Sequence, residues 1–131
     1  METREINNQS QHDRVIQTAF NNLDKVKHDV YINPGQQKQT SVGGQYPDII
    51  ITAKNDKNVK WIIEVETTES ISQDEAKNQW DQFSQLGGTF YLLVPKASRN
   101  LAELICIQNN IKARFGTYTI DTTNNILINY E

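Results

Sequence analysis

The chain of 131 residues is long enough for one domain that buries its own hydrophobic core. Its net charge of −3 argues against a protein that coats nucleic acid nonspecifically, because such binding needs a basic surface, but it does not exclude a nuclease, since bound divalent cations offset acidic charge. The single cysteine excludes an intrachain disulfide, and no apolar run approaches 18 residues, so we expect a cytoplasmic protein without a membrane span.

The first third of the chain predicts one helix, one short strand and a long loop. Residues 1–10 are polar, and we expect them to be disordered. A short strand is expected at 30–32, and residues 34–45, rich in Gly and Gln, predict a loop that leads into Pro47. Apolar residues at helical spacing predict a helix over 11–25, namely Val15, Ile16, Ala19, Phe20 and Leu23.

The middle of the chain predicts a β-hairpin followed by a helix. Two β-forming runs, 48–53 and 59–66, are separated by the polar, turn-prone residues 54–58. Ser72 then begins a capping box, which predicts a helix that ends before two glycines. The predicted buried stripe of this helix contains Ala76, Trp80, Phe83 and Leu86.

The last third predicts a buried strand at 89–94, a helix at 99–109 and strands at 112–120 and 126–130. The helix at 99–109 is expected to bury Leu101, Leu104 and Ile105. The strand–helix–strand step at 59–94 implies a parallel pair of strands. We therefore expect a single α/β domain over 1–131, with a central mixed β-sheet flanked by helices and the element order α-β-β-β-α-β-α-β-β.

Three acidic residues are predicted to converge at one end of this sheet. Side chains alternate along a strand, so Glu64 and Glu66 share one face, roughly 6.5–7 Å apart. Asp48 and Glu64 are symmetric about residue 56, the middle of the predicted turn, which places them side by side in the hairpin. Carboxylates this close repel unless a positive charge lies between them, and carboxylate oxygens suit Mg²⁺ or Mn²⁺. The alternative is that Glu64 and Glu66 line the solvated face of an edge strand.

These residues also resemble a known motif. Pro47-Asp48, fifteen intervening residues and then Glu64-x-Glu66, in this order of elements, resembles the PD-(D/E)XK nuclease superfamily, whose members typically cut nucleic acid phosphodiesters with a divalent metal. The resemblance implies a restriction-endonuclease-like or resolvase-like domain in which Asp48, Glu64 and the carbonyl of Val65 bind Mg²⁺ or Mn²⁺. Glu66 occupies the position usually held by lysine. A few restriction endonucleases of this fold carry Glu-x-Glu, and the last acid then holds a metal-bound water or acts as a base.

Other residues that could contribute to such a site also fit simpler structural roles. Gln79-x3-Phe83 resembles the Gln-x3-Tyr helix motif of recombination-type members, where the amide orients the site, but Gln79 also fits a polar residue at the edge of the stripe. His12 has no partner at metal-ligand spacing, so we expect a surface or capping role. Asp13 is either a helix cap or a peripheral acid of the site, and Cys106 is expected to pack in the interior.

The sequence therefore favours a small metal-dependent endonuclease that hydrolyses DNA, with Asp48, Glu64, Glu66 and Gln79 as the catalytic set. A domain of this size has little room for target recognition, so we expect a homodimer or a subunit of a larger system. The alternative is a catalytically inactive nuclease-fold module that binds DNA or protein, which the missing lysine favours. A third hypothesis is an unrelated α/β protein in which the acids have no function.

Overall fold

A mixed β-sheet forms the centre of the protein. The computed structural model describes residues 6–34 and 41–131, and within these ranges six strands form one sheet in the order β1-β2-β3-β4-β5-β6. The pairs β3–β4 and β4–β5 are parallel and the other neighbouring pairs are antiparallel. The strands are β1 (His28–Ile32), β2 (Ile49–Ala53), β3 (Val59–Val65), β4 (Thr89–Pro95), β5 (Arg114–Ile120) and β6 (Ile126–Tyr130).

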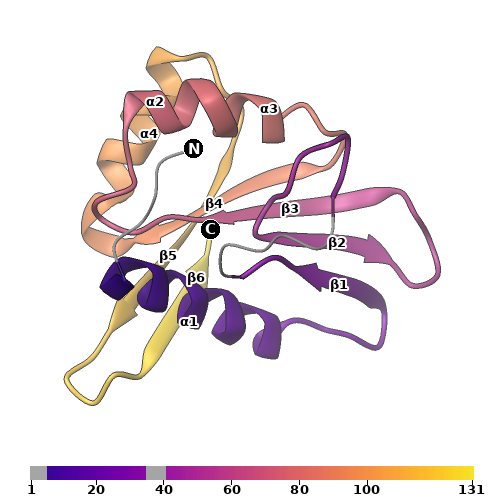
Figure 1. The fold of residues 1–131 in the computed structure, drawn as a ribbon, viewed down its shortest axis with the longest axis horizontal. Helices are drawn as coiled ribbons and strands as arrows, with labels where there is room; N and C mark the ends of the chain where they lie inside the picture. Colours follow the sequence, from indigo (N-terminus) through magenta and orange to yellow (C-terminus); the bar gives the residue numbers. More distant parts are fainter. Residues whose placement is uncertain (1–5, 35–40) are drawn as a thin grey trace.

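Helices cover both faces of this sheet (Figure 1). On one face lies α1 (Ile6–Asn22), which buries Val15, Ile16 and Ala19 against the strands. On the other face a continuous helical segment, composed of α2 (Gln73–Glu75), η1 (Ala76–Trp80) and α3 (Asp81–Phe83), packs beside η2 (Lys96–Ser98) and α4 (Arg99–Gln108). The sheet is therefore the middle layer of three.

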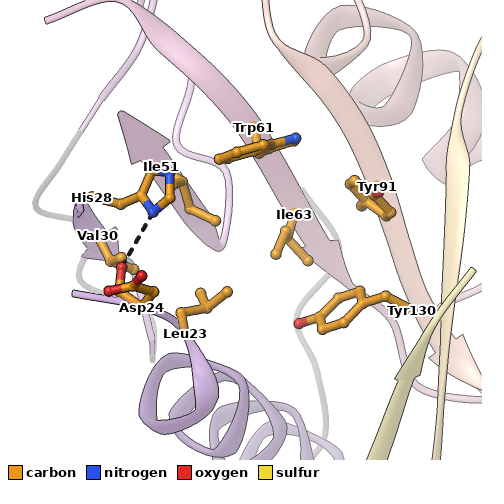
Figure 2. Close-up of a pocket in the computed structure, with 9 residues that line it drawn as sticks. All are labelled: Leu23, Asp24, His28, Val30, Ile51, Trp61, Ile63, Tyr91 and Tyr130. Carbon is orange, nitrogen blue, oxygen red and sulfur yellow. Dashed lines mark hydrogen bonds between the residues drawn. The ribbon is translucent and has the colours of Figure 1, made fainter. Parts of the chain in front are cut away.

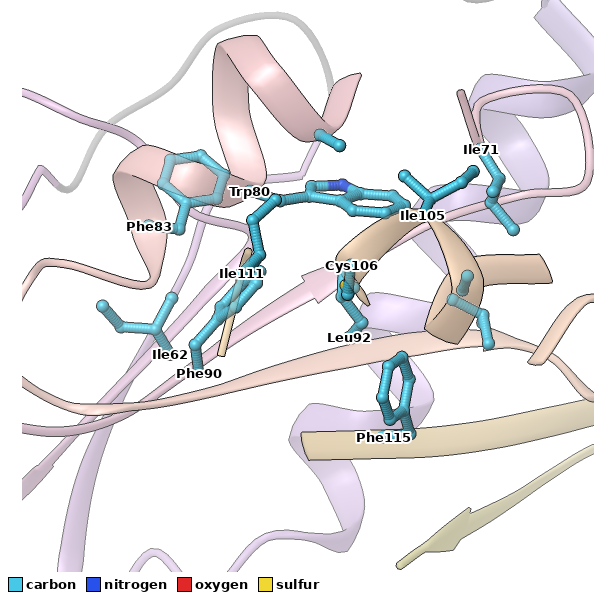
Figure 3. Packing of buried hydrophobic residues seen from close by; sticks show 13 residues of the cluster. Ile62, Ile71, Trp80, Phe83, Phe90, Leu92, Ile105, Cys106, Ile111 and Phe115 are labelled. Carbon is cyan, nitrogen blue, oxygen red and sulfur yellow. The ribbon is translucent and has the colours of Figure 1, made fainter. Parts of the chain in front are cut away.

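The core under α2, α3 and α4 is built from aromatic and aliphatic residues of the helices and strands. Trp80 and Ile105, on two different helical segments, belong to one buried cluster with Leu92 and Phe115 of the strands below them (Figure 3). Trp80 is fully buried. The prediction that Trp80 and Cys106 are core residues is confirmed.

The predicted element order is confirmed, and the hairpin has the register that its symmetry predicts. Ile49 pairs with Ile63, which places Asp48 beside Glu64, and a bulge between Ile51 and Thr52 absorbs one residue nearer the turn. The β3–β4 pair is parallel, as the crossover predicted.

Two details of the helices differ from the predictions. We expected disorder over 1–10, but α1 begins at Ile6; residues 1–5 lie outside the described ranges, as do residues 35–40 of the predicted loop. An i,i+4 hydrogen bond from Gln9 Nε2 to Asp13 Oδ1 (2.8 Å) supports this early turn. In α4, Ile105 is buried but Leu101 and Leu104 are each 50% exposed, because the helix turns Ala102, Ile105 and Cys106 toward the sheet instead.

In the ranges that the structure describes, no helix is long and apolar enough to cross a membrane.

Gly88 lies just before β4, close to Val59 and Lys60 of β3. A substitution at Gly88 therefore measures how closely these two strands approach. A Cβ atom there would lie 3.0 Å from the carbonyl carbon of Lys60 and 2.9 Å from Val59 Cγ1. We expect Gly88→Ala to lower the free energy of unfolding by about 1–3 kcal/mol, because backbone atoms cannot yield as a side chain can. Chemical denaturation measures this, with Thr89→Ala at the exposed neighbouring position as the control; equal stability of the two variants would show that the strands can separate.

Candidate acidic site

Asp48 and Glu64 meet where β2 begins and β3 ends. Both are almost fully buried, with exposed fractions of 3% and 4%. The Asp48 backbone N–H donates to Glu64 Oε1 (3.2 Å), and the two carboxyl groups also share a hydrogen bond, which requires a proton on one of them. The predicted convergence of these two acids is present in the structure.

Backbone and side-chain contacts fix Asp48 in this position. The Val65 backbone N–H donates to Asp48 Oδ2 (2.8 Å), so the carboxylate continues the hydrogen bonding between the strands. Buried Asn33, just after β1, donates from its backbone N–H to the Asp48 carbonyl (2.9 Å) and from Nδ2 to the Pro47 carbonyl (2.8 Å). The Pro47-Asp48 segment is therefore held from both sides.

Glu66 is the most deeply buried of the three acids. It is fully buried, and Trp80 Nε1 donates to its Oε1 (3.0 Å) while the Ser70 hydroxyl donates to its Oε2. Its backbone is held as well, since the Tyr118 hydroxyl donates to the Glu66 carbonyl (2.8 Å). Glu66 therefore lies beside Glu64 but has hydrogen-bond donors from the core on both carboxylate oxygens.

His12 belongs to this site, and the expectation that it lies on the surface is wrong. It is fully buried in α1, with Nε2 2.9 Å from Asp48 Oδ2 and Nδ1 3.2 Å from Asp13 Oδ1. Because carboxylate oxygens accept hydrogen bonds, an imidazolium that donates from both nitrogens satisfies both contacts. Asp13 lies inside α1 and contacts His12, so it is not the helix cap that was one of its two predicted roles.

Sequence reasoning missed His12 because its partner is distant in the chain. His12 and Asp48 are 36 residues apart, and they meet only because α1 crosses the sheet at the acidic end. One signal was present: His12 follows the same helical spacing as Val15, Ile16 and Ala19, on the face that α1 buries.

Gln79 reaches the site from the opposite face of the sheet. Its side-chain amide lies between two carboxylates, and with the nitrogen directed at these acceptors it donates to Glu64 Oε2 (3.2 Å) and Glu75 Oε2 (3.1 Å). Gln79 lies in η1, a π-helical turn, and such turns are frequent at functional sites. The structure thus brings Gln79 together with Glu64, as the interpretation of Gln79 as an amide that orients the site required.

The pKa of Glu64 is raised well above its ordinary value of 4.5. Burial is the main cause, and the neighbouring charges of Asp48 and Glu66 add to it. Glu64 therefore stays protonated to a higher pH than an exposed glutamate does.

The carboxylate oxygens of Asp48 and Glu64 are hard ligands, but they already take part in hydrogen bonds with neighbouring groups of the protein. Within the described ranges, no three histidine, cysteine, aspartate or glutamate side chains stand ready to hold a metal ion. The Asp48 and Glu64 carboxylates fit a hard cation chemically, because a cation between them would replace the proton that they share. The Val65 N–H is engaged by Asp48, and its side chain packs in the core under α1.

The chain was compared with protein-family models, curated proteins and solved structures, and none of them matches it.

Glu64→Gln should stabilise the protein in a pH-dependent way. The folded-state pKa of Glu64 lies above 4.5, so the folded protein binds this proton more tightly than the unfolded chain, and the stability of the wild type falls as pH rises from about 4.5 through the folded-state pKa. The amide carries no charge and escapes this loss. We therefore expect the variant to melt above the wild type at pH 8, and the difference to shrink as the pH is lowered toward 4.5.

Melting curves of both proteins across this pH range measure the effect, in buffer with a chelator. Glu69→Gln, at an exposed position three residues beyond the site, is the matched control. A difference that stays constant with pH would show that Glu64 is not held in a proton-sharing pair.

Proposed function

We propose that this protein is a metal-dependent nuclease that hydrolyses DNA phosphodiesters. The observation that carries the proposal is the Asp48–Glu64 pair, two buried carboxyl groups that share a hydrogen bond at the end of a hairpin, with the pKa of Glu64 raised. Acids that face one another in the interior destabilise a fold unless a proton or a cation lies between them. The resemblance of Pro47-Asp48 and Glu64-x-Glu66 to the PD-(D/E)XK motif supports the same function.

In this proposal Asp48, Glu64 and the Val65 carbonyl hold Mg²⁺ or Mn²⁺. When bound, such an ion polarises the scissile phosphate and lowers the pKa of a coordinated water. The protein's own residues fix the ligands: Asn33 positions the Pro47-Asp48 segment, and Gln79 positions the Glu64 carboxylate.

His12 supplies a feature that the motif otherwise lacks. The lysine of the common motif is replaced here by Glu66, which leaves the acids without the usual cation. The His12 imidazole lies 2.9 Å from Asp48 Oδ2 and, when protonated, places a positive charge beside the acids from α1. We assign it the role of orienting Asp48 and balancing its charge.

Metal binding and cleavage test the proposal together. Millimolar Mg²⁺ or Mn²⁺ should raise the melting temperature, because binding to the folded state adds a free energy of unfolding that reaches about 2.7 kcal/mol at one hundred times Kd. The same ions should support nicking of supercoiled plasmid. Glu64→Gln should lose both effects while remaining folded, and Glu69→Gln should keep both. A wild type whose melting is indifferent to both ions, and which leaves the plasmid intact, would overturn the proposal.

Position 66 decides whether the third acid takes part in the chemistry. Glu66→Lys is a poor test, because it would bury an ammonium group and leave Trp80 Nε1 and the Ser70 hydroxyl without their acceptor. Glu66→Gln removes the charge and keeps an acceptor oxygen for Trp80 Nε1, and the Ser70 hydroxyl can accept from the new amide while it donates to the Thr67 carbonyl (3.1 Å). If Glu66 is held mainly for the fold, this variant should nick plasmid within about tenfold of the wild type; a loss as complete as that of Glu64→Gln would make Glu66 a ligand or base.

The second candidate is a DNA-binding module without catalysis. One observation favours it: Lys60, Lys112 and Arg114 line a pocket of about 460 Å³ where β3, β4 and β5 begin, at the end of the sheet away from the acids. In the described ranges none of these three cations forms an ion pair, although the chain is acidic overall. Salt-dependent DNA binding that Lys112→Ala/Arg114→Ala abolishes, without cleavage in Mn²⁺, would favour this module over the nuclease.

A further inference from the structure

A second pocket lies on the α1 face of the sheet, and the acidic site does not use it. It has a volume of about 280 Å³ and opens just beyond the carboxyl-terminal end of α1, where Leu23 and Asp24 follow the helix. Figure 2 shows its lining residues around a common space. They are Leu23, Asp24, His28, Val30, Ile51, Trp61, Ile63, Tyr91 and Tyr130.

Aromatic rings form two walls of this pocket. His28 and Trp61 pack edge to face, with ring centroids 5.1 Å apart, and Tyr91 and Tyr130 do the same at 5.8 Å. The two pairs stand on opposite sides, with the aliphatic side chain of Ile63 between them (Figure 2). A flat ligand between such walls gains contact on both faces, which an aliphatic ligand does not match.

The pocket offers few polar groups, and they are neutral or already engaged. The Asp24 carboxylate accepts the Val26 and Lys27 backbone N–H groups (2.9 and 3.2 Å), so its hydrogen bonds are made to the loop that follows it. The Tyr130 hydroxyl points into the space (Figure 2) and, in the described ranges, has no hydrogen-bond partner. Burial and the nearby Tyr91 raise the pKa of Tyr130, so this hydroxyl stays a donor at neutral pH.

The volume indicates the size of the ring. An apolar cavity of about 150 Å³ accommodates a single benzene ring. A pocket of about 280 Å³ therefore suits a bicyclic ring better than a single one. We expect an uncharged ligand, because among the described lining residues the Asp24 carboxylate already accepts two backbone N–H groups. The ligand should also carry an acceptor for the Tyr130 hydroxyl.

We propose that this pocket binds a neutral purine ring, stacked between the His28–Trp61 and Tyr91–Tyr130 pairs with a ring nitrogen or oxygen accepting from Tyr130. The inference does not depend on the nuclease proposal, since the residues that line this pocket are different from those of the acidic site. The purine can come from a free nucleoside or from an unpaired base of a nucleic acid, and both share this chemistry.

The two tryptophans of the chain provide the test, because Trp61 lines the pocket and Trp80 is buried on the opposite face. Titration with adenosine should shift the indole N–H resonance of Trp61 and quench its fluorescence, and should leave the Trp80 resonance in place. Cytidine should bind more weakly than adenosine, and ribose should not bind. A purine oligonucleotide that binds more tightly than adenosine identifies the nucleic acid as the source; equal affinity identifies the free nucleoside.

Two variants locate the ligand. Tyr130→Phe keeps the ring and should weaken adenosine binding about threefold to tenfold, as expected for one lost hydrogen bond, while Tyr31→Phe, at an exposed position outside the pocket, should not. Trp61→Leu should weaken it at least about tenfold. The proposal is overturned if adenosine at several millimolar does not shift the Trp61 indole resonance, or if it shifts the resonances of both indoles alike. It is also overturned if cyclohexanol displaces adenosine as well as guanosine does. These outcomes are read from the wild-type spectra, so they remain decisive even if a variant fails to fold.

Discussion

The hydrogen bond from the Val65 backbone N–H to Asp48 Oδ2 is the contact on which the acidic end of the sheet depends. It closes the β2–β3 hairpin with a side chain where the backbone ladder ends. The same oxygen lies 2.9 Å from His12 Nε2, so one carboxylate joins two strands and the helix that covers them. Because a buried carboxylate is costly without donors, these contacts are what allow Asp48 to lie in the interior.

Much of this could be predicted from the sequence, because it depends on local geometry. Strand alternation and a short polar turn suffice to place Asp48 beside Glu64, and the observed pairing of Ile49 with Ile63 agrees. The bulge at Ile51/Thr52 could not be predicted, yet it left the register at the acidic end intact because it lies on the turn side of that pair. The three helices and six strands could also be predicted, because the spacing of apolar residues within short stretches of sequence distinguishes helix from strand.

What the sequence could not predict depends on contacts between distant elements. No pattern around His12 reveals that its ring meets a carboxylate 36 residues away, since the angle at which α1 crosses the sheet is set by packing of the whole core. Likewise, Leu101 and Leu104 fit a buried stripe as well as Ala102 and Cys106 do, and only the position of α4 over β4 and β5 decides between the two faces. In both cases tertiary structure selects between arrangements that the local sequence allows equally.

The three acids, which look alike in the sequence, differ in what the fold does for them. Glu66 receives a donor on each carboxylate oxygen from Trp80 and Ser70, so its charge is satisfied by the core and needs no ligand to explain it. Asp48 and Glu64 instead face each other, and burial together with the neighbouring carboxylates raises the pKa of Glu64. A well-packed apolar pair would serve stability better at that position. Natural sequences keep such local conflicts mainly where function requires them, so the Asp48–Glu64 pair supports the proposed site more strongly than the Glu64-x-Glu66 pair that stands out in the sequence.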